Sequence, residues 1–334
     1  MTKGSTGFER PLTKDEARWA VEQAAKAPSI HNTQPWRFRW EGDTFELYAD
    51  TTRVLSAVDP DGRELVISCG AALLGLRLAL RKVGFDSKVR VLPDPANPRL
   101  LAGVVATEGD PASQKERLAF AGLLHRHTHR GGFEDRSIES TLLVELQHAA
   151  EVEGAELVYV HDFGQRRRVL GLARAAANTM AKDADVSAEV LDWTPPAGSR
   201  RRDGVPAAAY EAEPRSHDDD LPARDFDLGR GQGSLRSTAP VPAGVIALLA
   251  TVGDRQVDWL AAGQALERVL VTATVHGISA AVHSQLAELA SSRNELRREF
   301  YSNGCPQLLL RFGYAPPGKA PTPRRPVDDI VDLT

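Results

Sequence analysis

Two long apolar stretches recur in the sequence, and each begins and ends with glycine. Residues 70–84 and 263–277 align without a gap, 193 positions apart. Upstream of each, a helical pattern leads into a strand pattern, at 27–37 and at 150–160, which are 123 positions apart. One apolar helix could recur by coincidence, but the repeated order of helix, strand, long helix and strand indicates a duplicated unit. The difference between the two offsets predicts about 70 additional residues inside the second copy.

Composition limits the class of protein. The 334 residues are 42% hydrophobic, which is enough for one large core or two ordinary ones. With 41 Lys and Arg against 45 Asp and Glu, the net charge of −4 gives no general attraction to nucleic acid or to an anionic membrane. The two cysteines, Cys69 and Cys305, are too few for a disulfide framework and lack zinc-site spacing.

The sequence shows no signal peptide and no membrane span. The first ten residues have no apolar core, and the best apolar run, 245–252, is too short to cross a bilayer. We therefore expect a cytoplasmic, globular protein whose partners are small molecules, with no nucleic acid and no membrane among them.

The first copy predicts a simple series of elements. Thr13 and Glu16 fit a capping box ahead of a helix. A nearly apolar helix around 65–80 is expected at the heart of the molecule, because it has almost no polar face. Strands are predicted at 36–40, 45–48, 89–92 and 101–106, and in the second copy a helix at 138–150 with strands at 156–160 and 307–314. We expect residues 1–120 to form the first half and residues 121–334 the second.

Residues 27–38 form the most informative loop, Ala-Pro-Ser-Ile-His-Asn-Thr-Gln-Pro-Trp-Arg-Phe. Pro28 and Pro35 restrict the backbone at both ends. The fixed hydroxyl and amide groups of Ser29, Asn32 and Gln34 suit a ligand edge that alternates carbonyls and ring nitrogens. The same side chains could instead satisfy only the local backbone of a helix-to-strand turn.

This loop resembles the Ser-x-x-Asn-x-Gln-Pro-Trp signature of the flavin-dependent nitroreductase family. With His31 and Thr33 it is most similar to the Acg-like branch, in which two nitroreductase halves are fused. The resemblance implies an α+β, nitroreductase-like fold with two pseudo-symmetric halves, each a central mixed sheet flanked by helices. It also implies that Pro28, Ser29, Asn32 and Gln34 contact FMN, and that the chain is a monomer acting as a fused pseudo-dimer.

The second half opens with a basic tract, Leu-His-Arg-His-Thr-His-Arg-Gly-Gly-Phe, at 124–133. Alternation would place Arg126, Thr128 and Arg130 on one side of an extended segment, where guanidinium groups pair well with a phosphate. The tract is similar to the family's Arg-x-Ser-x-(Lys/Arg)-x-x-Phe opening, which implies that His127 also lies near the flavin. A solvated basic loop is an alternative. The three histidines could also bind a metal, but no carboxylate or cysteine has matching spacing, and we predict none.

Two later segments complete the expected FMN site. The strand ending at Tyr314 and the basic residues after it resemble the family's C-terminal segment, which implies phosphate contacts from Arg325 first and Arg324 second. Ser284 and Gln285 occupy the position where the family directs a backbone N–H at flavin N5. The family often has Glu-Gly there, so the resemblance implies that Ser284 and Gln285 bind the flavin through the backbone and implies no role for their side chains.

The additional residues of the second copy are predicted at about 192–244, a stretch rich in Gly and Pro. Large apolar side chains are scattered through it, namely those of Trp193, Tyr210, Phe226 and Leu228. They favour a lid that covers the flavin rather than a disordered linker.

Two functions follow from the resemblance. The first is an FMN-dependent oxidoreductase in which NADPH or NADH reduces the flavin by hydride transfer at N5, and an electron-poor acceptor is then reduced; no protein nucleophile is required. The second is an FMN-sequestering or storage protein, because a seated lid would exclude both nicotinamide and acceptor. Sequence alone leaves open whether the protein is an enzyme. Because the flavin loop occurs only in the first half and the basic tract only in the second, we expect one FMN per chain.

Overall fold

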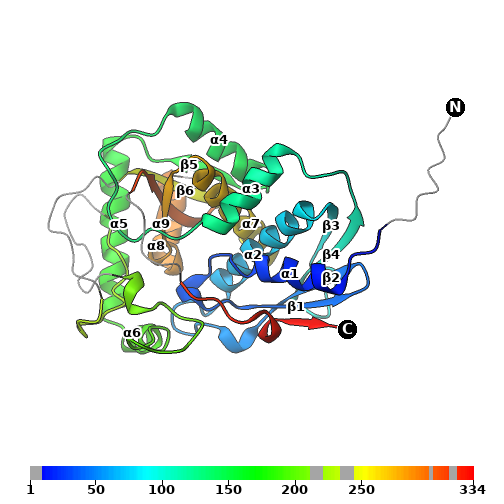
Figure 1. Cartoon of the computed structure of the whole chain (residues 1–334). Coiled ribbons are helices and arrows are strands. Elements are labelled where there is room, and N and C mark those ends of the chain that lie inside the picture. Colours follow the sequence, from blue (N-terminus) through cyan, green and yellow to red (C-terminus); the bar gives the residue numbers. More distant parts are fainter. Residues whose placement is uncertain (1–9, 211–220, 234–243, 301–303, 316–321) are drawn as a thin grey trace.

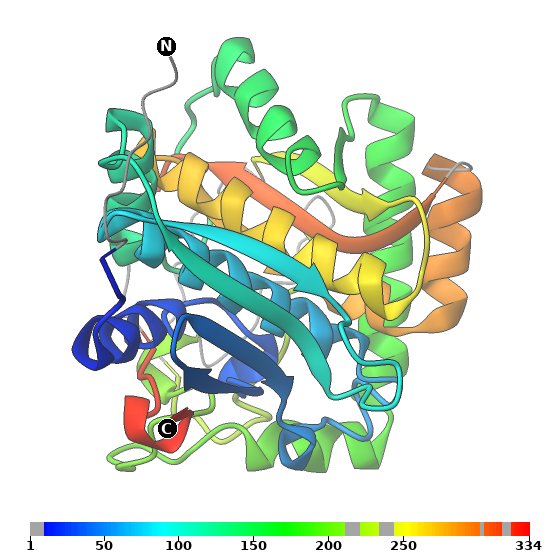
Figure 2. The same cartoon turned by 90° about the vertical axis from the view of Figure 1, so that its right-hand side faces the viewer.

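Two long helices cross at the centre of the computed structural model, α2 (Arg63–Lys82) and α7 (Gln256–Val275). The model describes residues 10–210, 221–233, 244–300, 304–315 and 322–334. Both helices are 20 residues long, and their bounds are related by the predicted offset of 193. They lie between the two sheets of the molecule (Figures 1 and 2).

Glycine permits the crossing of α2 and α7. A Cβ atom added at Gly263 would overlap the carbonyl oxygen of Ile67 and lie 2.8 Å from the Cα of Gly70. Gly70 and Gly263 are equivalent positions in the repeat, so the two copies touch at the same residue. Only glycine allows the helix backbones to approach this closely.

The first sheet contains the strand order β3-β4-β2-β1-β9. The first four strands, from β3 to β1, pair with one another in antiparallel fashion. The last, β9, comes from the C-terminus and pairs in parallel with β1, with Trp40 opposite Leu333. The bounds are β1 Trp36–Glu41, β2 Thr44–Ala49, β3 Phe85–Val91, β4 Leu100–Glu108 and β9 Val331–Leu333. The end of the chain therefore belongs to the sheet of the first half, although the sequence placed it in the range 121–334.

The second sheet repeats the order of the first as β7-β8-β6-β5, again with antiparallel neighbours. Its strands are β5 Glu156–Tyr159, β6 Val245–Thr251, β7 Ser279–His283 and β8 Cys305–Gly313. Each strand corresponds to one of β1 to β4. This shared topology confirms the predicted α+β fold of two pseudo-symmetric halves.

Helices cover the two sheets unequally. The helix α1 (Lys14–Ala24) begins with the predicted capping box and packs with α2 and α3 (Gln114–His125) over one face of the first sheet. The second sheet packs on α4 (Ser140–Glu151) and α7 on one face. Its other face is covered by three further helices, which are α5 Phe163–Ala181, α8 Gln285–Glu288 and α9 Ala290–Phe300.

The connection between β5 and β6 contains most of the difference between the halves. The equivalent strands β1 and β2 are joined by Gly42 and Asp43 alone, whereas β5 and β6 are joined by residues 160–244. This β5–β6 connection contains α5, α6 (Ala184–Asp192) and the short helix η3 (Ala207–Ala209). The connection therefore begins well before residue 192, where the sequence predicts that the additional residues start. Within the predicted lid, residues 211–220 and 234–243 lie outside the described residues.

The loop before the first strand also differs between the halves. Residues 25–35 join α1 to β1, and they include the short helix η1 (Ile30–Asn32). Only residues 152–155 join α4 to β5. The predicted match of 27–37 to 150–160 is therefore a match of position in the fold, because the second copy has no loop of comparable length. Two more short helices are η2 (Thr51–Arg53) and η4 (Val327–Asp329).

Bilayer crossing requires a long, uniformly apolar helix, and the described part of the chain contains none that qualifies.

Candidate functional site

A cavity of about 140 Å³ lies between the two halves. Its walls come from seven parts of the chain: the loop before β1, the start of α2, the basic tract, the β5–β6 connection, α7, the segment from β7 into α8, and β8. Its polar and aromatic lining residues include Ser29, His31, Glu64, Thr128, Arg130, Tyr210, Arg224, Phe226, His283, Ser284, Gln285 and Arg311.

The loop before β1 has an unusual backbone. His31, Asn32 and Gln34 have φ values of 45°, 55° and 52°, in the left-handed region that disfavours most side chains. Such a conformation persists only where surrounding contacts determine it. One of these contacts is internal, since the backbone N–H of Gln34 donates to the hydroxyl of Ser29 at 3.0 Å.

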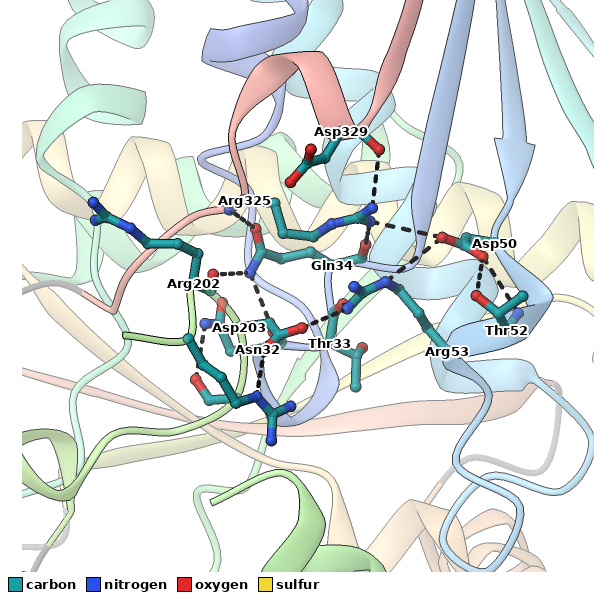
Figure 3. A network of polar contacts seen from close by, with 12 residues as sticks. Asn32, Thr33, Gln34, Asp50, Thr52, Arg53, Arg202, Asp203, Arg325 and Asp329 are labelled. Carbon is teal, nitrogen blue, oxygen red and sulfur yellow. Dashed lines mark hydrogen bonds and ion pairs between the residues drawn. The ribbon is translucent and has the colours of Figure 1, made fainter. Parts of the chain in front are cut away.

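The side chains of Asn32 and Gln34 attach this loop to two distant segments (Figure 3). The Asn32 amide donates to the carbonyl oxygens of Gly204 at 2.9 Å and Pro323 at 3.1 Å. The Gln34 amide donates to the carbonyl of Arg202 at 2.9 Å, and its oxygen accepts from the backbone N–H of Arg325 at 2.8 Å. These polar groups are therefore used to hold the β5–β6 connection and the C-terminal segment, and neither residue lines the cavity.

Arg53 and Arg325 extend the same network. Arg53 donates to the carbonyl of Thr33 and to the carboxylate of Asp203, both at 2.9 Å. The Arg325 guanidinium donates to the carbonyls of Gln34 at 3.2 Å and Asp329 at 3.0 Å, and lies 3.7 Å from the Asp50 carboxylate. Arg325, which the sequence predicts as the first phosphate contact, thus lies among Gln34, Asp50 and Asp329.

Arg324 lies instead in a cluster with Arg126, Arg130 and Glu267. Arg126 and Arg324 both donate to the carbonyl of Lys26, at 3.0 and 2.9 Å. The Nε of Arg126 lies 3.4 Å from a carboxylate oxygen of Glu267, which is fully buried on α7. Burial and the like charge of Arg126 lower the pKa of Arg130 to about 10. Burial, followed by the like charges of Arg126 and Arg130, lowers the pKa of Arg324 to about 9.

This arginine cluster holds three cations and one carboxylate. Among the described residues, several donors have no hydrogen-bond partner, namely Nε and one terminal nitrogen of Arg126 and the Nε of Arg324. Buried polar groups are normally satisfied, so free donors on adjacent guanidinium groups fit a bound anion with several acceptor oxygens. A phosphate monoester has these properties.

The basic tract leads from the arginine cluster to the cavity. Its backbone is extended, since Thr128 bridges to Ala280 and the N–H of His129 donates to the carbonyl of Ala280 at 2.8 Å. Thr128, His129 and Arg130 line the cavity. His127, predicted near the flavin, is not among the lining residues, and its ring lies 3.4 Å from the carbonyl of His125.

The alternative of a metal site finds no matching geometry in the tract. Within the described ranges, no group of three or more His, Cys, Asp or Glu side chains is arranged to hold a metal ion. The ring of His129 contacts the carbonyl of Gly132 at 2.8 Å.

Ser284 and Gln285 lie at the junction of β7 and α8, and both line the cavity as do Pro28 and Ser29. Next to them, the Nε of Arg311 donates to Nε2 of His283 at 2.9 Å. Burial, followed by Arg311, lowers the pKa of His283 to about 3, so this imidazole is neutral. A neutral ring that accepts at Nε2 has its proton on Nδ1, which faces the carbonyl of Pro222.

Two further lining residues were missed as candidates. His31 is buried and packs edge-on against Phe226, with ring centroids 5.4 Å apart. Neither of its ring nitrogens has a hydrogen-bond partner among the residues described. Burial, and then Arg224 and Arg130, hold its pKa well below the usual value. Burial also raises the pKa of Glu64 to about 8. The motif gave the position of His31, but only the three-dimensional placement shows that its ring is unpartnered at a cavity.

The β5–β6 connection closes one side of the cavity. Tyr210, Arg224 and Phe226 line it, and Arg224 forms a buried ion pair with Glu288 of α8. Phe226 also packs against Tyr210, with ring centroids 6.0 Å apart. About 140 Å³ is less than the roughly 300–1,000 Å³ typical of pockets that enclose small ligands. A ligand as large as a flavin ring therefore fits only if these walls shift.

No family model matches the chain. It is 32% identical, over 95% of its length and 91% of the other's, to "Putative NAD(P)H nitroreductase Rv3131" of Mycobacterium tuberculosis. It is 28% identical, over 96% of its length and 97% of the other's, to "Putative NAD(P)H nitroreductase acg" of the same organism.

One solved structure illustrates the distance to other nitroreductases. "FMN and NADPH-dependent nitroreductase NfnB" from "sphigopyxis sp. strain HMH" is 17% identical, with a TM-score of 0.40, and the match covers 65% of this chain and 98% of the other. A likeness of that size carries no conclusion about the site, whereas the relatives above match over nearly their whole length and at up to 32% identity. The chain therefore belongs to the nitroreductase family, within its Acg-like branch.

Proposed function

We propose that this protein is an FMN-binding oxidoreductase of the nitroreductase type, with NADPH or NADH as the reductant of the flavin and a small electron-poor molecule as acceptor. The names of its relatives support the reaction class. The observation that carries the FMN site is the arginine cluster beside a cavity with polar walls: Arg126 and Arg324 have free donors, and Arg130 reaches both regions.

The residues of the chain would divide the binding of FMN between them. Arg126, Arg130 and Arg324 hold the phosphate by charge-assisted hydrogen bonds. Ser29, Thr128, Ser284 and Gln285 offer polar groups along the cavity walls, and Ile67 and Leu266 offer apolar contact. When bound, FMN supplies the centre that accepts and donates hydride. The part of the chain around it fixes its orientation and excludes water.

Asn32, Gln34 and Arg325 have a supporting role in this proposal. Their hydrogen bonds hold the strained loop that presents Ser29 and His31. A residue that positions a loop affects ligand binding through the loop, and so differs from a residue that touches the ligand.

Sequestration of FMN is a second candidate, which the walls of the cavity favour. Tyr210 and Phe226 narrow it, and the ion pair of Arg224 with Glu288 fastens the wall to α8. A wall that stays closed would bind the flavin tightly but would exclude nicotinamide and acceptor.

Anaerobic mixing of the FMN-loaded protein with NADPH, and separately with NADH, tests the proposal. Bleaching of the flavin within seconds, followed by reoxidation with a quinone or nitroaromatic, is expected of the oxidoreductase. A flavin that is reduced slowly by dithionite and by neither nicotinamide would contradict the oxidoreductase and support sequestration.

We further propose that the chain acts as a monomer with small-molecule partners alone, because the two halves that form the cavity are both present in one polypeptide. Sedimentation equilibrium of the FMN-loaded protein tests this statement, and a stable dimer would contradict it.

A further inference from the structure

Glu267 is a carboxylate placed without hydrogen bonds in the interior of the protein. It is 0% exposed, and neither side-chain oxygen has a hydrogen-bond partner in the part of the chain that the structure describes. Its nearest cation is Arg126, with 3.4 Å between Nε and Oε1. The equivalent position in α2, 193 residues earlier, is Leu74, which is also fully buried. A carboxylate therefore occurs in α7 where the other copy of the repeat is apolar.

The charged groups around Glu267 come from two segments. Arg126 follows α3, and Arg324 belongs to the C-terminal segment. The positive charges of both favour the ionised form of the Glu267 carboxyl group. Arg130 repels both arginines electrostatically. Two carboxylates of α4 and the turn after it that lie near α7 have other partners. Glu153 pairs with Arg77 and Arg268, and Glu145 pairs with His276.

We propose that Glu267 is an internal counter-ion of Arg126 and Arg324, and that it takes up one proton from solvent when a phosphate-bearing ligand binds these arginines. This inference rests on the proposed FMN site. The step is a proton transfer from water to a carboxylate oxygen, and no other bond changes.

The reason is competition between two anions for the same cations. Without a ligand, the guanidinium groups favour the ionised carboxylate, while burial opposes it. A phosphate among the same donors brings between one and two further negative charges, which disfavour a second anion at this place. Burial has already raised the pKa of Glu267 to about 7, so a moderate additional rise leaves it neutral at physiological pH.

The sign of the pH dependence follows. Since the complex favours the protonated carboxyl, FMN affinity is highest below about pH 7 and falls as the pH rises above the pKa of the free protein. The dissociation constant is expected to rise about tenfold per pH unit in that range, because one proton is bound with each ligand. Riboflavin lacks the phosphate and should show no such dependence.

Isothermal titration calorimetry in buffers of different ionisation enthalpy measures the proton directly. At about pH 8, wild-type protein should take up about one proton per FMN and none per riboflavin. The phosphate, with a second pKa of about 6, is already a dianion there. Glu267→Gln should bind FMN without proton uptake at that pH, and with an affinity that changes little between about pH 7 and pH 8, where Arg324 remains charged. Glu151→Gln, at an exposed carboxylate of α4, should behave as wild type.

Each outcome decides the question. FMN binding to wild type without proton uptake would overturn the counter-ion role while leaving the proposed FMN site intact. Uptake that persists in Glu267→Gln would assign the proton to another group and also overturn it. If Glu267→Gln does not fold, the comparison of FMN with riboflavin on wild type still decides. Failure of FMN to bind at any pH would overturn this inference together with the proposed function.

Discussion

The two halves of the molecule share one topology and differ in what covers their sheets. Along β1 of the first sheet, buried Trp36, Phe38 and Trp40 alternate with exposed charged residues, as expected for a sheet with one face in water. Along β8 of the second sheet, all nine residues are buried, because α5, α8 and α9 cover the outer face.

The same contrast holds at the polar site. The first half has the long loop before β1, with three left-handed residues, while the second half has a four-residue connection at that place. The second half has the arginine tract and Glu267, while the first has Leu74 at the position equivalent to Glu267 in the repeat. Duplication thus kept the helix crossing and the strand order, and the two copies then specialised in different parts of one site.

The helix crossing is where the halves are most alike, and breaking it should have the largest effect. Gly263→Leu forces a side chain into the backbone of α2 at Ile67 and Gly70. We expect the free energy of unfolding in urea to fall by more than about 3 kcal/mol, or the protein not to fold.

Gly171→Ala is the matched control for that substitution, since Gly171 lies within the helix α5 with no atom near the position of the added Cβ. It should raise stability by about 0.5–1 kcal/mol. A well-folded Gly263→Leu protein of wild-type stability would show that the two halves are not in backbone contact.

The start of α2 differs from that of α7 in a buried carboxyl group. Glu64 has a pKa of about 8, raised by burial from an ordinary 4.5, and the equivalent residue in α7 is Val257. A raised folded-state pKa means that the contribution to stability is complete below about pH 4.5 and is lost as the pH rises to about 8. Glu64→Gln should flatten this decline, with a difference of a few kcal/mol at most.

Urea unfolding of wild type and Glu64→Gln at a series of pH values measures that decline. Glu151→Gln, at an exposed position, should retain the wild-type slope. Parallel curves for wild type and Glu64→Gln would mean that Glu64 is ionised throughout the range.

Substitution of Arg126 and of Arg325 should separate contact with the ligand from support of the loop. Arg126→Ala removes donors from the arginine cluster, so FMN affinity should fall at least tenfold, corresponding to about 1.5–3 kcal/mol per charged hydrogen bond. Riboflavin affinity should not change.

Arg325→Ala should weaken both ligands equally and lower stability, because its partners are Gln34, Asp50 and Asp329. Fluorescence titration with both flavins provides the measurement. Selective loss of FMN in Arg325→Ala would instead support Arg325 as the phosphate contact that the sequence predicts.

A substitution in the cavity wall that the β5–β6 connection supplies should have the smallest effect. Phe226→Ala removes a ring that packs on His31 and Tyr210, so bound flavin should be reduced by dithionite severalfold faster and should dissociate faster. Phe163→Ala, at an exposed ring on α5 of the same connection, is the control. Equal rates in wild type and Phe226→Ala would place the flavin away from this wall.

The repeated core was predictable because its signals are local. Apolar periodicity gave α2 to within two residues at each end, and the capping box at Thr13 and Glu16 gave the start of α1. The matching stretch 263–277 located α7, but this helix begins seven residues earlier, at Gln256. The order of these elements was sufficient to predict two halves of like topology.

The partners of the polar residues were not predictable, because they are backbone groups far away in the sequence. Asn32 bonds the carbonyl of Gly204, and Gln34 bonds that of Arg202, about 170 residues later. A carbonyl has no sequence signature, so the motif could be located but its contacts could not. The strand β9 was missed for a similar reason, since three residues are too short to show a period.

The number of flavins bound per chain tests the fused-dimer site most directly. After reconstitution with excess FMN and removal of free ligand, flavin absorbance against protein mass should give one FMN per polypeptide, because each half supplies a different part of a single site. Two FMN per polypeptide would contradict this, since the second half would then bind flavin without a long loop, and the first without an arginine tract.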